Sequence, residues 1–84
     1  MMKTYFMVQE RIRPSWIHEM VVKANEFEQC QIFFECNTLK INAKSHLSMS
    51  LLNGMQGICC VSAVGEDSRT AVDALRSLGT GSLS

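Results

Sequence analysis

The apolar residues between positions 17 and 27 constrain the fold more than any other feature of the sequence. They recur every three or four residues, which is the spacing of one helix face: Ile17, Met20, Val21, Ala24 and Phe27. Arg13-Pro14-Ser15 precedes them, and proline suits a first helical turn because its missing N–H loses no hydrogen bond there. We therefore expect an amphipathic helix that opens near Pro14 and lies on a sheet.

Four short segments have the patterns of β-strands. Residues 2–8, 31–36 and 39–42 alternate apolar side chains, as strands with one buried face do. The turn at Asn37-Thr38 joins two of them into a hairpin. Residues 58–64 are almost continuously apolar, which predicts a strand in the centre of the sheet.

Two further helices follow from the remaining segments. The first covers residues 45–52 and is capped by Ser45, and its Leu47, Met49 and Leu51 could face either the core or a partner, although short helices usually bury their leucines. The second begins after the Gly65-Glu66-Asp67-Ser68 turn, and Gly79 is expected to end it, with residues 79–84 as a frayed tail.

The resulting order of elements is βαββαβα, without a linker, a repeat or a low-complexity segment. Three helices on one face of a four-stranded, mostly antiparallel sheet would bury all the helix stripes at once. We therefore predict an α+β fold, an open-faced sandwich, in a single domain of residues 1–84.

Composition excludes several classes of function. The chain carries eight basic and eight acidic side chains, so a nucleic-acid partner is not expected. The sequence contains neither an apolar run of the ~18 residues that a membrane span needs nor a signal peptide, so we expect a cytoplasmic protein without membrane insertion. The spacing of the four cysteines, Cys30, Cys36, Cys59 and Cys60, favours reduced, buried thiols over a metal site, and no cofactor is indicated.

Four stretches of the sequence, spread over nearly its whole length, carry a family resemblance. They are Arg13-Pro14, Lys23-Ala24-Asn25-Glu26-Phe27, Ile41-Asn42-Ala43-Lys44-Ser45 and Gly65-Glu66-Asp67. In these stretches and in its order of elements the chain resembles HPr, the histidine-containing phosphocarrier of the bacterial sugar phosphotransferase system, and its regulatory paralogues. The resemblance implies an HPr-like fold and a protein that passes on phosphate or docks to partners.

Phosphate-carrying members of that family use the histidine of a Gly-Ile/Leu-His-Ala-Arg-Pro motif at the start of the first helix. An arginine replaces this histidine here: Arg11 if the Arg-Pro pairs are aligned, Arg13 if the alignment runs back without gaps from Ala24. A guanidinium can bind an anion but has no lone pair with which to accept a phosphoryl group. His18 lies roughly one turn inside the helix, where it would replace the nucleophile only after a rearrangement of the loop.

Ser45 matches a second site of the family, a serine that a dedicated ATP-dependent kinase phosphorylates so that a catabolite-control transcription factor binds. A phosphate there would meet the amides of a helix start, with Lys44 nearby. Family members usually continue with an apolar pair and glycine, whereas His46, Leu47 and Ser48 follow here. The alternative is that Ser45 serves only as a helix cap.

Three functions are consistent with these residues. The first is a non-enzymatic adaptor whose docking face combines the arginines, Ser45, His46, Leu47 and Trp16, with enzyme I, the serine kinase or the transcription factor as candidate partners. Trp16 could instead complete the core. The second is a phosphocarrier that accepts phosphate on His18 through enzyme I, and the third is an anion-binding domain that retains only the fold.

Overall fold

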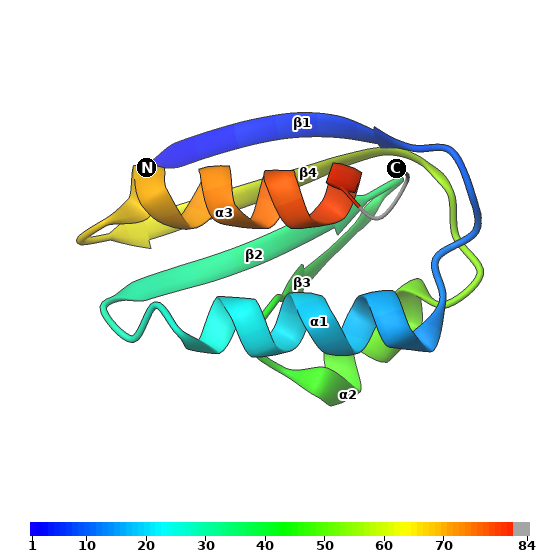
Figure 1. Cartoon of the computed structure of the whole chain (residues 1–84), viewed down its shortest axis with the longest axis horizontal. Coiled ribbons are helices and arrows are strands. Elements are labelled where there is room, and N and C mark those ends of the chain that lie inside the picture. Colours follow the sequence, from blue (N-terminus) through cyan, green and yellow to red (C-terminus); the bar gives the residue numbers. More distant parts are fainter. Residues whose placement is uncertain (82–84) are drawn as a thin grey trace.

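The computed structural model describes residues 1–81 of the chain, and its elements follow the predicted order (Figure 1). They are β1 (Met2–Val8), α1 (Pro14–Asn25), β2 (Cys30–Cys36), β3 (Leu39–Asn42), α2 (His46–Met49), the 3₁₀ turn η1 (Ser50–Leu52), β4 (Gly57–Gly65) and α3 (Ser68–Gly81).

The four strands form one sheet in the order β1-β4-β2-β3, and every neighbouring pair is antiparallel. The predicted central position of β4 is confirmed, because it pairs with β1 on one side and with β2 on the other. Its Val61 lies opposite both Thr4 and Phe34. Residues 59–63 of this strand are buried, whereas Ile58 and Val64 near its ends are 62% and 43% exposed, so only the middle of the apolar run is buried.

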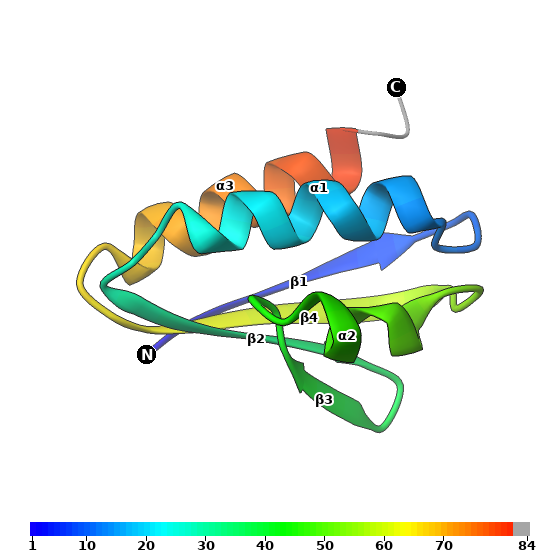
Figure 2. The ribbon, with the colours of Figure 1, turned by 90° about the horizontal axis from the view of Figure 1, so that it is seen from below.

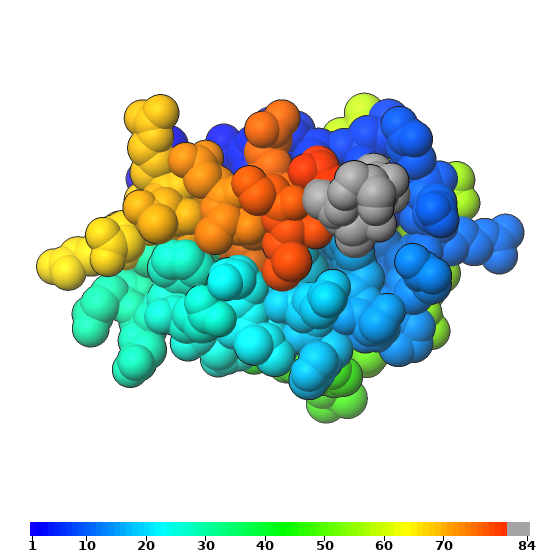
Figure 3. Space-filling view, viewed as in Figure 1, coloured from blue at the N-terminus to red at the C-terminus, as the bar shows by residue number. Residues whose placement is uncertain are grey.

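The long helices α1 and α3 lie next to each other on one face of the sheet (Figures 2 and 3). Between helices and sheet lies a core that includes Phe34, 0% exposed, with Phe6 and Trp16 edge-on to it at ring-centroid distances of 5.9 and 5.6 Å. The helix stripe predicted from the sequence supplies Ile17, Met20, Val21 and Ala24 to this core. The predicted α+β open-faced sandwich is therefore confirmed.

The second helix differs from the prediction. It is a four-residue α-helix that tightens into η1, and it buries Met49 and Leu52, both 0% exposed. Leu47 and Leu51, which could have faced either the core or a partner, are 84% and 58% exposed. The exposure of Leu47 agrees with its prediction as a partner-surface residue, and Met49 and Leu52, three residues apart, form the buried side of the segment.

Gly79 does not end the last helix, since α3 continues to Gly81. A β-carbon at Gly79 would lie 2.8 Å from Cε2 of Phe6 and 3.5 Å from Cζ2 of Trp16. The glycine therefore allows the helix to approach two aromatic rings closely, and it does not serve as a C-cap. Of the predicted tail, residues 79–81 belong to α3, and residues 82–84 lie outside the described residues.

The adjacent cysteines of β4 face opposite sides of the sheet, as the strand alternation predicts. Cys59 belongs to the core, where its thiol donates to Sγ of Cys36 at 3.1 Å. Cys60 pairs with Tyr5 of β1 and lies outside the core cluster, on the open face of the sheet. All four thiols are free. Within residues 1–81, no helix is both long and apolar enough to cross a membrane.

Candidate functional site

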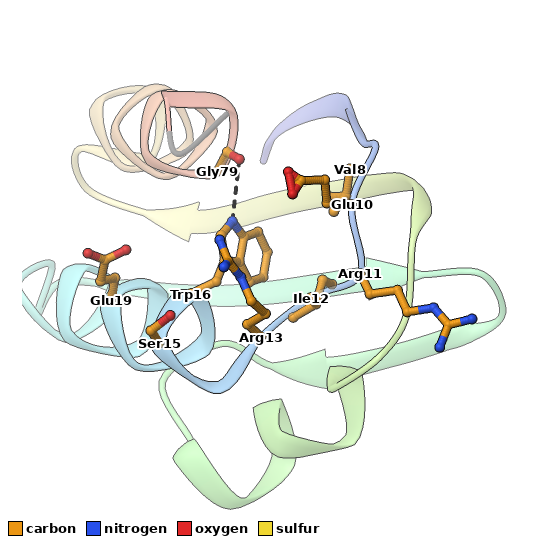
Figure 4. Close-up of a pocket in the computed structure, with 9 residues that line it drawn as sticks. All are labelled: Val8, Glu10, Arg11, Ile12, Arg13, Ser15, Trp16, Glu19 and Gly79. Atoms are coloured by element: carbon orange, nitrogen blue, oxygen red, sulfur yellow. Dashed lines mark hydrogen bonds between the residues drawn. The ribbon is translucent and has the colours of Figure 1, made fainter. Parts of the chain in front are cut away.

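The start of α1 forms a small pocket. Arg13 is the N-cap residue, with an extended backbone, and its carbonyl oxygen accepts the amide of Ile17 at 3.1 Å. The pocket has a volume of about 90 Å³. It is lined by Val8, Glu10, Arg11, Ile12, Arg13, Ser15, Trp16, Glu19 and Gly79. Figure 4 shows the Arg13 side chain directed toward the Trp16 indole and the Arg11 side chain directed away from it.

The loop before α1 is held by the turn that follows η1. The amide of Ile12 donates to the carbonyl of Met55 at 2.8 Å, and the amide of Gly54 donates to the carbonyl of Ile12 at 2.8 Å. The side chain of Ile12 is 3% exposed. Because its neighbour Ile12 is fixed on both sides, the backbone that carries Arg13 has a defined position, and the start of α1 is connected to the segment that ends η1.

Trp16 belongs to the core beneath this pocket. It is 7% exposed, and its indole Nε1 donates to the carbonyl of Gly79 at 3.3 Å (Figure 4). The prediction that Trp16 contributes to a partner surface is therefore corrected: the indole is covered by α3, and the alternative, that it completes the core, is confirmed.

Ser45 is the N-cap residue of α2. Its backbone is extended, and its Oγ accepts the amide of Ser48 at 3.2 Å. The preceding turn is fixed by Asn42, whose Oδ1 accepts the amide of Lys44 at 2.9 Å. Ser45 is half-buried, so part of the hydroxyl-bearing side chain remains accessible while the oxygen satisfies an otherwise unpaired helix amide.

Lys44 points away from Ser45, which sequence reasoning did not anticipate. Its ammonium group donates to the carbonyls of Phe27 at 2.6 Å and Cys30 at 2.5 Å, where the chain passes from α1 to β2. The side chain of Asn25 completes the junction by donating to the carbonyl of Lys44 at 3.1 Å. Two of the family-like stretches thus hold each other in place. The expectation that Lys44 would lie beside a phosphate on Ser45 is corrected, since its donors face these carbonyls.

The two histidines lie together on the outside of α1 and α2. The rings of His18 and His46 have centroids 6.0 Å apart, with 62° between their planes, and both residues are exposed. Leu47 follows His46 and is also exposed. Among residues 1–81, those that line the pocket at the start of α1 do not include His18. The structure therefore groups the predicted residues into an arginine pocket and a separate surface formed by Ser45, the two histidines and the leucines Leu47 and Leu51.

The buried thiols are poor candidates for a covalent phosphate carrier. Burial raises the pKa of the Cys59 thiol, and its hydrogen bond to Cys36 raises this pKa further. Burial also raises the pKa of Cys60, an effect that the charge of Lys3 opposes. A thiol with a raised pKa stays protonated near neutral pH and is a weak nucleophile. Side chains at the starts of α1 and α2 are therefore the better candidates for function.

Comparison with protein families decides the identity of this fold. A sequence-family model, described as the phosphorylation site of the HPr component of the phosphotransferase system, matches residues 13–80. The chain belongs to the HPr family. A comparison with curated protein sequences gave no match at the required significance.

Solved HPr structures agree with this assignment. The HPr-C-His protein of Thermoanaerobacter tengcongensis superposes with a TM-score of 0.81 at 26% identity, over 93% of this chain and 90% of that one. An HPr dimer of the same organism gives 0.72 at 31% identity, over 87% and 82%. The solution structure of Crh, the catabolite repression HPr of Bacillus subtilis, gives 0.57 at 26% identity, over 92% and 94%. The likeness to HPr proteins thus extends over most of both chains.

Proposed function

We propose that this HPr-family protein is a regulatory adaptor, not itself an enzyme, that docks to proteins of the phosphotransferase system or of carbon regulation, with Ser45 as a phosphorylation switch. The observation that carries the proposal is the contrast between two helix starts: Arg13 occupies the N-cap position of α1 without a side-chain capping bond, while Ser45 at the start of α2 retains a hydroxyl near the exposed Leu47.

The position of Ile12 supports Arg13 as the residue that replaces the family histidine. That histidine follows an isoleucine or leucine in the family motif, and Ile12 is a buried apolar residue directly before the N-cap Arg13. The alternative alignment would place Glu10, which is exposed, at the apolar position before Arg11. Because the guanidinium of Arg13 has no lone pair, the pocket would hold an anion without accepting a phosphoryl group.

A docking role is supported by the apolar surface of α2 and η1. Leu47 and Leu51 are 84% and 58% exposed, and His46 lies beside them. Large side chains presented in this way on a short, fixed segment can act as anchors for a partner. The similarity to Crh, the catabolite repression HPr of Bacillus subtilis, favours a partner in carbon regulation.

Phosphorylation of Ser45 would change this surface and leave the fold intact. It would add a charge of about −1.5 to −2 beside Leu47 while the Ser48 amide retains an oxygen acceptor. Lys44 would keep its own bonds to Phe27 and Cys30. The added charge therefore acts outward, on a partner that reads the surface of α2.

The test is phosphorylation of the purified chain by the serine kinase of the family with ATP, followed by mass spectrometry of peptides. We expect one acid-stable phosphate, on Ser45, and none after Ser45→Ala. Ser48→Ala, a change in the same helix, is the matched control and should accept phosphate. An unlabelled protein, or label that persists in Ser45→Ala, would contradict the proposed switch.

A further inference from the structure

We propose that His18 and His46 form a two-histidine site for a divalent transition-metal ion, bridging α1 and α2. The two imidazoles come from α1 and α2, which contact each other (Figure 1), and their ring centroids are 6.0 Å apart. The proposal does not depend on phosphorylation of Ser45 or on the identity of a docking partner.

The separation of the rings suits a shared metal ion. A zinc ion about 2.0–2.1 Å from an imidazole nitrogen is about 3.2 Å from that ring's centre, so two rings on one tetrahedral ion have centres about 5.2 Å apart. The observed 6.0 Å is within about 1 Å of this separation. The planes now meet at 62°, edge to face, and rotation about the soft χ2 bond of either histidine can aim a nitrogen at the space between the rings.

The surroundings of the pair define the kind of site. Both histidines are exposed, so an ion can reach them without opening the fold. Within residues 1–81, no group of three or more histidine, cysteine, aspartate or glutamate side chains is placed to hold a metal. Water would therefore complete the coordination shell, and the site would be open. Imidazole ligands favour copper, nickel and zinc over magnesium and calcium, which sets the chemical class of the ion.

Binding would have a structural consequence. An ion held by both residues links the outer side of α1 to the first residue of α2, the helix whose N-cap is Ser45. Anything that binds only the folded state stabilises it in proportion to its concentration and affinity. The ion would also occupy the surface beside Leu47, so metal and docking partner would compete for it.

The test uses tag-free protein, because His18 and His46 are the only two histidines in the chain. Cu²⁺, and separately Zn²⁺, is titrated by calorimetry, with the fluorescence of the single tryptophan, Trp16, as a second signal for Cu²⁺. We expect one ion per chain and a rise in Tm. Since the second imidazole binds within the same molecule, His18→Ala and His46→Ala should each weaken binding by at least about tenfold.

A variant with the same number of histidines separates chelation from simple histidine content. His46→Ala combined with Arg69→His moves one imidazole to an exposed position at the start of α3, away from α2 (Figure 1). This variant should bind as weakly as His46→Ala. Equal binding by the relocated variant, two independent weak ions per chain, or a metal-induced dimer in sedimentation would each overturn the proposed intramolecular site.

Discussion

The starts of α1 and α2 differ in the residue at the N-cap position and in how the amides of the first turn are paired. Both helices begin with unpaired backbone amides. At α2 the Ser45 hydroxyl accepts one of them, from Ser48. At α1 the N-cap is Arg13, whose side chain has only donors, and Pro14 removes one amide from the first turn. The first helix thus begins with a cation beside a pocket. The second begins with a hydroxyl that already accepts a hydrogen bond from a helix amide.

This difference contrasts a helix start where residue 13 offers no lone pair with one where residue 45 retains a hydroxyl. The side chain of Arg13 is exposed, and Ile12 holds the loop through backbone bonds, so residue 13 can change without cost to the fold. Ser45 is useful to the fold whether or not it is phosphorylated. Its presence alone therefore does not demonstrate a switch, and experiments must separate capping from phosphorylation.

The largest expected effect tests whether Trp16 supports the α1 start from inside. Trp16→Ala removes a buried ring and its bond to the Gly79 carbonyl, and should lower the free energy of unfolding by about 3–5 kcal/mol. Urea unfolding followed by circular dichroism measures the change. Trp16→Phe should cost less, and Val22→Ala, at an exposed position of the same helix, should stay within about 0.5 kcal/mol. A stable Trp16→Ala protein that fails only in partner binding would make Trp16 a surface anchor.

The second-largest expected effect tests whether Lys44 stabilises the fold or binds a phosphate on Ser45. Lys44→Met removes a charged donor from the carbonyls of Phe27 and Cys30, and should cost about 1.5–3 kcal/mol in the same measurement. Lys23→Met, which breaks the exposed ion pair with Glu26, is the control and should cost less than about 0.5 kcal/mol. If Lys44→Met keeps its stability and changes partner binding only after phosphorylation, Lys44 contacts the phosphate on Ser45 instead.

A smaller effect separates the two tasks of Ser45. Ser45→Ala should lower the free energy of unfolding by about 1 kcal/mol, because the Ser48 amide loses its acceptor. Ser45→Asn should keep nearly full stability, since asparagine caps as well as serine, yet it offers no hydroxyl for phosphorylation. If Ser45→Ala is as stable as the unmodified protein, the hydroxyl is not acting as a cap.

The smallest expected effect on stability comes from the arginines at the start of α1, and these variants test whether the pocket binds an anion. Arg13→Ala should change the free energy of unfolding by less than about 0.5 kcal/mol. The same change should weaken binding of inorganic phosphate by about two- to fivefold, as expected for a solvated charge pair. Arg11→Ala should weaken it less, because that side chain points away from the pocket (Figure 4). Phosphate titrations followed by NMR chemical shifts provide the comparison. Equal phosphate affinities of Arg13→Ala and the unmodified protein would show that Arg13 does not bind the anion.

The sequence was sufficient for the elements that have a clear period. The stripe of Ile17, Met20, Val21 and Ala24 specifies α1, and the continuous apolar run of β4 specifies the sheet centre. These patterns succeed because burial of one face, or of both faces, repeats along the element.

The remaining details depend on contacts between distant residues. The sequence left Leu47 open between the core and a partner surface, and the buried side of this segment is formed by Met49 and Leu52. Gly79 looks like a helix stop until Phe6 and Trp16 are seen against it. The direction of Lys44 follows from carbonyls 14 and 17 positions earlier in the chain, which no local pattern specifies. The meeting of His18 with His46 likewise follows from how α2 packs on α1.

The central claim, that the start of α1 does not accept a phosphoryl group, is tested most directly with enzyme I. The purified chain is incubated with enzyme I and labelled phosphoenolpyruvate, with an active HPr as the positive control, and acid-labile phosphate is measured and mapped. The claim predicts no label on the chain while the control is labelled. Acid-labile phosphate on His18, lost in His18→Ala, would contradict it and identify a working phosphocarrier.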